Sequence, residues 1–174
     1  MPNFNPSTQE MIGSITGGMR VDTGDLLATL VLDHNPAVAV QLFTVHGRIQ
    51  LLSLYYEVST DLSADVAQLT WNATFSLPVV ITIQPIGTKC ASVSGLAAGR
   101  RIVWGGGIVS TAATITDSAG ISNFAAVAPA IIGMEDGVGT IGSLCTDATC
   151  TSGVLKCSLH YLPMSDGAYV ENII

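Results

Sequence analysis

The chain has 174 residues, of which 48% are apolar and only 11% are charged, and its formal net charge is −7. Its six cations are scattered among thirteen carboxylates, which argues against nucleic-acid binding, because that affinity depends on clustered Lys and Arg. The long uncharged segments are all interrupted by Pro, Gly, Asn, Gln or Thr, so we expect no membrane-spanning helix.

The apolar surplus indicates a protein that works in an assembly. A single domain of this length buries about 70% of its surface on folding. A composition that is nearly half apolar gives more apolar surface than one small domain can bury. We therefore expect the excess to be buried against other subunits, as in an obligate oligomer, and the acidity to keep the assembly soluble.

Residues 1–25 are predicted to form a polar, glycine-punctuated N-terminal arm that docks on a neighbouring subunit. Within the arm, residues 7–10 fit a capping box, and the apolar positions after them predict a short helix that ends at Gly17 and Gly18. The first six residues have no cationic region followed by an apolar run. We therefore expect no signal peptide and synthesis in the cytoplasm.

Residues 26–174 are predicted to form an all-β body. Apolar residues recur with a period of two, and turn residues follow every eight to twelve positions, which is typical of an antiparallel sandwich or a jelly-roll-like barrel. The predicted strands are residues 26–33, 38–45, 48–60, 66–75, 78–83, 102–104, 111–116, 139–144 and 154–162.

Two of these strands have contrasting patterns. In residues 66–75, polar side chains alternate with Leu69, Trp71, Ala73 and Phe75, which predicts a half-buried strand. Residues 48–60 have apolar side chains on both faces, so we expect this strand to be covered on both sides and to lie at a trimer axis. The candidate subunit-interface residues are Ile49, Leu51, Leu52, Leu54, Tyr55, Tyr56 and Val58.

Two connecting segments also carry expectations. His46 and Gly47 form a plausible two-residue hairpin turn in which Gly47 takes a positive φ. Residues 105–134 are rich in Gly, Ala and Ser and have one charged side chain before Met134, Asp117. We expect an insertion that lies against a partner surface, with a flexible loop containing a short hairpin as an equal alternative.

The motifs that carry catalysis are absent from the sequence. It has no phosphate-binding loop followed by Lys and Ser or Thr, no paired-histidine metalloprotease helix and no nucleophile elbow. Ser158, His160 and Asp166 can be imagined as a triad, but strand alternation places only the first two on one face. We expect His34 and His46 in turns and His160 on an exposed or interface strand. The protein is predicted to be no enzyme, with no catalytic residue, cofactor or metal.

The four cysteines, Cys90, Cys145, Cys150 and Cys157, leave three alternatives open. A zinc site would need Cys90 or His160 beside the other three, at spacings wider than usual. A disulfide is possible if residues 139–144 and 154–162 form a hairpin that brings Cys145 and Cys157 together, or if Cys150 closes the loop onto a neighbour. Buried free thiols would suit a reducing cytoplasm, and we expect thiols at synthesis with possible later oxidation.

The segment from Lys156 to Val170, taken with Gly47-Arg48-Ile49 and the residues 57–60 that follow, resembles small virion structural proteins of tailed bacteriophages. In those proteins a strand ends in a closure of the form Tyr-x-Pro-(Leu or Met)-x-(Asp or Ala)-Gly-Ala-x-Val near the chain end. Cys157 stands where a large aromatic residue is expected, so core packing at that position is expected to differ.

The resemblance implies a β-rich subunit that forms a homotrimer on the capsid exterior and stabilises the shell as a cement or decoration protein. Its partners would be copies of itself and the major capsid protein or other virion subunits, and its location would be the virion after synthesis in the host cytoplasm.

Two alternative functions remain open. One is a phage tail or spike-base structural protein. The other is a carbohydrate- or receptor-binding β module, in which aromatic rings would stack on the ligand. The candidate rings belong to Trp71, Trp104, Tyr55 and Tyr56. Because the aromatic residues lie mostly on apolar faces, core packing is the favoured role for them.

Overall fold

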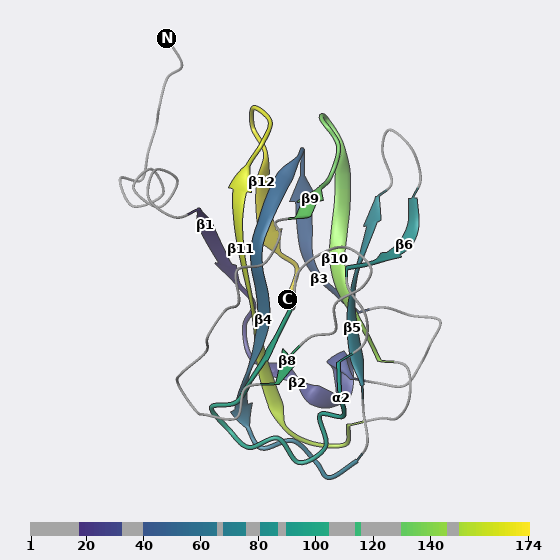
Figure 1. Ribbon diagram of the computed structural model, residues 1–174, viewed down its shortest axis with the longest axis vertical. Helices are drawn as coiled ribbons and strands as arrows, with labels where there is room; N and C mark the ends of the chain where they lie inside the picture. Colours follow the sequence, from purple (N-terminus) through teal and green to yellow (C-terminus); the bar gives the residue numbers. More distant parts are fainter. Residues whose placement is uncertain are drawn as a thin grey trace.

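The computed structural model is a sandwich of two β-sheets (Figure 1). It describes residues 18–32, 40–65, 68–75, 81–86, 90–104, 114–115, 130–145 and 150–174. Seven strands form the sheet that we call sheet A, five form sheet B, and every ladder between described residues is antiparallel. The predicted all-β sandwich is therefore confirmed. No ladder in the described ranges joins the two sheets, so they do not close into a barrel.

Sheet A has the order β1-β11-β4-β7-β8, with β2 paired to β11 and β9 paired to β4. Its strands are β1 (Met19–Asp22), β2 (Leu26–Leu27), β4 (Ile49–Thr60), β7 (Arg101–Val103), β8 (Thr114–Ile115), β9 (Ala130–Ile132) and β11 (Val154–Pro163). Sheet B has the order β12-β3-β10-β5-β6. Its strands are β3 (Val40–His46), β5 (Leu69–Phe75), β6 (Ile81–Pro85), β10 (Val138–Cys145) and β12 (Tyr169–Asn172).

The chain crosses repeatedly between the sheets. It leaves sheet B after β3, enters sheet A at β4 and returns to sheet B at β5, and it crosses again between β9 and β10 and between β11 and β12. At each of these crossings, consecutive strands lie in opposite layers, and each sheet is assembled from distant parts of the chain.

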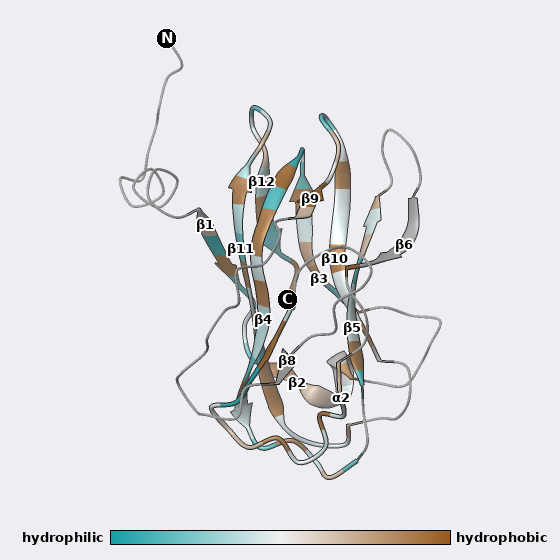
Figure 2. Cartoon of the chain, in the orientation of Figure 1, coloured by the Kyte–Doolittle hydropathy of each residue, from teal (hydrophilic) through white to brown (hydrophobic). Residues whose placement is uncertain are grey.

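The core lies between the sheets, and bands of apolar residues alternate with polar ones along the strands (Figure 2). Leu69, Trp71, Ala73 and Phe75 are all buried, which confirms the predicted inner face of β5. Trp71 stacks on Tyr56, with ring centroids 5.4 Å apart. Cys157 is the partner of Tyr56 across the β4–β11 ladder and is also buried. The Tyr56 and Trp71 rings thus supply bulk beside the small side chain at Cys157.

A β-bulge in β4 changes the interpretation of its apolar pattern. Ser53 pairs with His160 and Leu51 with Tyr161, so Leu52 is an extra residue without a partner position. One extra residue shifts the alternation by one step. Side chains 49 and 51 before the bulge and side chains 54, 56 and 58 after it therefore face the same core.

Five of the seven candidate interface residues lie in the core of the sandwich and not at a surface. Ile49, Leu51, Leu54, Tyr56 and Val58 are at most 1% exposed and are covered by the other sheet. Tyr55, which is 7% exposed, lies on the outer side of sheet A, and Leu52 is the bulge residue. Before and after the bulge, the strand has ordinary alternation of core and outer residues, but the two parts are offset by one residue. Read as one continuous strand, this sequence looks as if both faces were buried.

Residues 26–33 are also corrected. The strand ends at Leu27, and α2 (Ala28–Val31) is a single helical turn in which the Leu32 N–H donates to the Ala28 carbonyl at 2.7 Å. Ala28 and Leu32, one turn apart, are both fully buried. A short apolar run fits a buried strand and a buried helix equally well, which is why periodicity gave the wrong assignment here.

The segment at His46 and Gly47 is a corner between the sheets, not a hairpin turn. β3 and β4 flank it and lie in sheet B and sheet A respectively. Gly47 has a φ of 73°, as expected for a glycine in a tight turn.

Both predicted appendages contribute strands to the body. β1 pairs with β11, so residues 19–22 belong to sheet A and not to the arm. The insertion at 105–134 supplies β8, which pairs with β7, and β9, which pairs with β4. The helix expected after residues 7–10 and the turn at His34 lie outside the described residues. Within the described ranges, no helix has the length and apolar character needed to cross a bilayer.

Candidate functional site: a charged sheet face and an interlocked apex

The outer surface of sheet A carries a group of polar side chains from four neighbouring strands. The ladders align Asp22 with Ser158 and Ser158 with Tyr55, and align Lys156 with Glu57 and Glu57 with Arg101. The alternate residues of these strands face the core, so these side chains point outward. We call this group the charged face; its members are Arg20, Asp22, Tyr55, Glu57, Arg101, Lys156, Ser158 and His160.

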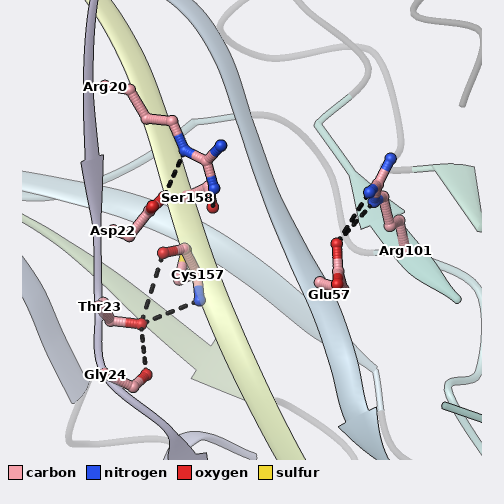
Figure 3. Close-up of polar contacts among 8 residues, drawn as sticks. All are labelled: Arg20, Asp22, Thr23, Gly24, Glu57, Arg101, Cys157 and Ser158. Carbon is pink, nitrogen blue, oxygen red and sulfur yellow. Dashed lines mark hydrogen bonds and ion pairs between the residues drawn. The ribbon is translucent and has the colours of Figure 1, made fainter. Parts of the chain in front are cut away.

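Two ion pairs organise the charged face (Figure 3). The Arg20 Nε lies 2.8 Å from Asp22 Oδ1, and Arg101 Nη2 lies 2.9 Å from Glu57 Oε2. Burial raises the pKa of Asp22, but hydrogen bonds from Arg20 and Ser158 outweigh it and hold that pKa below its usual 3.8. The Arg101 guanidinium also lies over the Tyr55 ring, 5.6 Å from its centroid. The charges are thus held in place by partners within the face.

The imagined triad does not form. Ser158 and His160 share the charged face, as alternation predicts, but no hydrogen bond joins them in the described structure. Asp166 is exposed in the turn after β11. The acidic neighbour of Ser158 is Asp22, which the sequence interpretation missed because β1 was assigned to the arm. The alternation of apolar and charged residues in Met19-Arg20-Val21-Asp22 was the sequence signal that could have identified this strand.

His160 is nevertheless unusual. Its Nε2 is buried and has no hydrogen-bond partner. Burial lowers the pKa of His160 below 6.5, and the charge of Arg20 lowers it further, although Asp22 opposes this. The side chain therefore favours the neutral form in the folded protein.

Thr23 anchors the end of β1 next to the charged face (Figure 3). The Cys157 N–H donates to Thr23 Oγ1 at 2.9 Å, and the Thr23 N–H donates to the Cys157 carbonyl, also at 2.9 Å. The hydroxyl in turn donates to the Gly24 carbonyl at 3.0 Å. One buried side chain thereby extends the β1–β11 ladder past the last strand residue.

The cysteines do not form the predicted hairpin pair. β10 and β11 lie in different sheets, so Cys145 and Cys157 are not opposite each other in a ladder. Cys150 and Cys157 are buried free thiols, the buried Cys90 Sγ accepts the Leu69 N–H at 3.3 Å, and the side chain of Cys145 lies outside the description. Burial raises the pKa of Cys157 well above its usual range, which makes this thiol unreactive. The described His, Cys, Asp and Glu side chains include no group of three that could hold a metal ion.

At one end of the sandwich, three turns lock together into a surface that we call the apex. It consists of residues 46–48, 131–137 and 163–171. The Gly47 N–H donates to the Gly137 carbonyl, and the Met164 N–H to the Arg48 carbonyl, both at 2.8 Å. The Arg48 N–H donates to Ser165 Oγ at 3.0 Å. Each turn is thus bonded to a turn that is distant in sequence.

Close backbone packing makes the apex rigid. Gly133 has a φ of 91°, and a Cβ there would lie 2.1 Å from the Gly47 carbonyl oxygen. Asp136, at a φ of 60°, is the one non-glycine residue with positive φ in the described chain. Strained residues of this kind persist where the surroundings fix them, often at functional positions.

The apex also exposes apolar side chains. Six large hydrophobic residues of the described chain are exposed, and three of them are in the apex: Ile131 at 56%, Met164 at 47% and Tyr169 at 44%. Tyr169 stacks on His46 at a centroid distance of 4.2 Å, and His46 Nε2 lies 3.1 Å from Glu171 Oε1. Ile131 faces the outer side of sheet A and Tyr169 the outer side of sheet B, so the apex exposes apolar side chains on both of its flanks.

A scan against protein-family models finds no matching family, and comparisons with curated proteins and with solved structures find no match either.

Proposed function

We propose that this chain is a non-enzymatic structural protein of a virion, an oligomeric capsid cement or decoration protein of the tailed-bacteriophage type, acting as a homotrimer. In this role it would bind copies of itself and the major capsid protein or other virion subunits. The added buried area would stabilise the shell. At about 25 cal/mol per Å² of apolar area, an interface of a few thousand Å² offers tens of kcal/mol before association costs.

The apex is the observation that carries this proposal. The closure that resembles the virion proteins, from Tyr161 to Val170, includes most of the third apex turn, with exposed Met164 and Tyr169. Exposed apolar residues on a fixed backbone suit a docking surface, because little entropy is lost when a rigid surface binds. The sandwich fold by itself does not argue for this role, since one fold serves many unrelated functions.

The binding-module alternative has less support. Trp71, Trp104 and Tyr56 are at most 2% exposed, and Tyr55 is 7% exposed beneath the Arg101 guanidinium. None of these rings offers an open face on which a sugar could stack.

The location of the protein tests the proposal. Particles would be purified from the source that encodes this sequence and digested for mass spectrometry, with the soluble fraction of the same lysate as the control. We expect peptides of this chain in the particles, in fixed ratio to the major capsid protein. Recovery of the chain only from the soluble fraction would overturn the proposal.

A further inference from the structure

We propose that copies of this chain associate end to flank, with the apex of one copy docking on the charged face of the next. This inference rests on the proposed function, because it names the subunit contact within the proposed assembly. The observations behind it are the distribution of charge, the exposed apolar residues and the rigidity of the apex.

Charge is divided unevenly between the two surfaces. The charged face holds three cations, Arg20, Arg101 and Lys156, against two carboxylates, Asp22 and Glu57, so its net charge is +1. The rest of the chain has the remaining three cations and eleven carboxylates, a net charge of −8.

The apex is acidic by the same count. Its four exposed carboxylates belong to Glu135, Asp136, Asp166 and Glu171, and Arg48 is its one cation, so its net charge is −3 with His46 neutral. Copies of a chain with net charge −7 repel each other. Association between them therefore needs surfaces of opposite sign, and the charged face and the apex provide such a pair.

The net positive charge of the charged face is too far from the apex to neutralise it within one copy. Arg20 and Arg101 are paired with Asp22 and Glu57, so the net charge comes from Lys156. Lys156 lies on β11 seven residues before Pro163, where the apex begins, which is roughly 23 Å at about 3.3 Å per residue. The Debye length at physiological ionic strength is about 8 Å, so Lys156 attracts an apex only when another copy brings one close.

The exposed apolar side chains belong to the apex. Ile131, Met164 and Tyr169 are exposed there, whereas the Tyr55 ring in the charged face is 7% exposed beneath the Arg101 guanidinium. Contact between two different surfaces is heterologous, and successive copies related by one rotation close into a ring if the rotation allows it. A trimer is one such ring.

Charge variants of the full chain, analysed by sedimentation equilibrium at about 0.02 M and about 0.5 M salt, test the inference. Glu135→Lys and Asp166→Lys each make the net charge of the chain less negative. If repulsion between the net charges of two copies controlled association, both variants would associate more strongly. We expect each to weaken association roughly tenfold at low salt, and less at high salt. The matched control is Asp25→Lys, which makes the same charge change at an exposed loop position outside both surfaces.

The charged face is tested in the same way. Lys156 is exposed, and Lys156→Ala should weaken association about fivefold at low salt. Ala91→Glu alters the net charge equally at an exposed position outside both surfaces and should have a smaller effect. Circular dichroism would check that each variant is folded.

The outcomes separate the two proposals. An oligomer that is insensitive to the apex and charged-face variants, or equally sensitive to their controls, overturns this inference and leaves the proposed function standing. A wild-type chain that stays monomeric at micromolar concentration and low salt overturns this inference, and with it the homotrimer of the proposed function.

Discussion

Single side chains complete hydrogen bonds that the strands leave open. Thr23 is the clearest example, because its hydroxyl accepts the buried Cys157 N–H after β1 has ended. A buried N–H without a partner costs about 1–3 kcal/mol. The Thr23 hydroxyl therefore adds to the stability that the β1–β11 ladder gives this edge.

Replacing Thr23 with valine tests this dependence. Thr23→Val keeps the shape of the side chain but leaves the Cys157 N–H unpaired, so we expect the free energy of unfolding in urea to fall by about 1–3 kcal/mol. Thr23→Ser retains the hydroxyl and should lose less. Equal losses in the two variants would mean that the methyl group, and not the hydrogen bond, stabilises this position.

His160 should make stability depend on pH. Its pKa is lowered on folding by burial and by Arg20, so the folded chain binds this proton less readily than the unfolded chain. As pH falls through about 6.5, the unfolded state gains protons first and the free energy of unfolding decreases. Asp22, whose folded pKa lies below 3.8, loses its contribution only at lower pH.

The measurement is urea unfolding at about pH 7.5 and about pH 5.5, for the wild type and His160→Gln. We expect the wild type to lose more stability than the variant between these two conditions. If both lose the same amount, other groups control the pH dependence.

The residues of the charged face could be predicted in part. Alternation placed Ser158 and His160 together, because they lie two apart on one strand. It could not place Asp22 beside them, since that contact joins positions 136 residues apart in the sequence. Local pattern determines which face a side chain takes, whereas its neighbours depend on pairing between distant strands.

At the scale of elements, the bulge in β4 shows where pattern reading fails and how it could succeed. If Leu52 is left out of the sequence, the segment from Ile49 to Val58 alternates regularly between core and outer positions. A single inserted residue therefore accounts for the doubly apolar pattern. The sequence contained this information, but two buried faces explained the pattern equally well.

The apex turns depend on glycine for close approach. Gly133→Ala would place a methyl group 2.1 Å from the Gly47 carbonyl oxygen at a positive φ. We expect a loss of at least about 1–3 kcal/mol in the free energy of unfolding, measured in urea. Gly24→Ala is the matched control, because nothing lies within 4 Å of its added methyl group. A comparable loss in the control would show that backbone flexibility, and not the contact, sets the cost.

At the scale of the whole molecule, the all-β architecture could be predicted from the sequence, but the order of the strands in the sheets could not. Period-two alternation and regular turns identify a sandwich locally. The order of the sheets depends on pairs such as Met19 with Tyr161, which no local signal specifies. This is also why β1 was assigned to an arm and β9 to an insertion.

The same topology predicts slow folding. β1 pairs with β11 near the other end of the described chain, so a very long loop must close before this ladder forms. All-β domains with such distant pairings fold in milliseconds to seconds. Stopped-flow fluorescence of the buried Trp71 and Trp104 should show the main refolding phase in this range. A main phase in microseconds would contradict the described topology.

The Tyr161 hydroxyl has a consequence for the behaviour of free subunits. It accepts the Val170 N–H at 3.1 Å, on the outermost strand of sheet B. Unpaired backbone N–H groups on an edge strand can pair with a strand of another chain, and such pairing starts aggregation. With this amide occupied internally, a concentrated pool of unassembled protein is protected there from uncontrolled polymerisation.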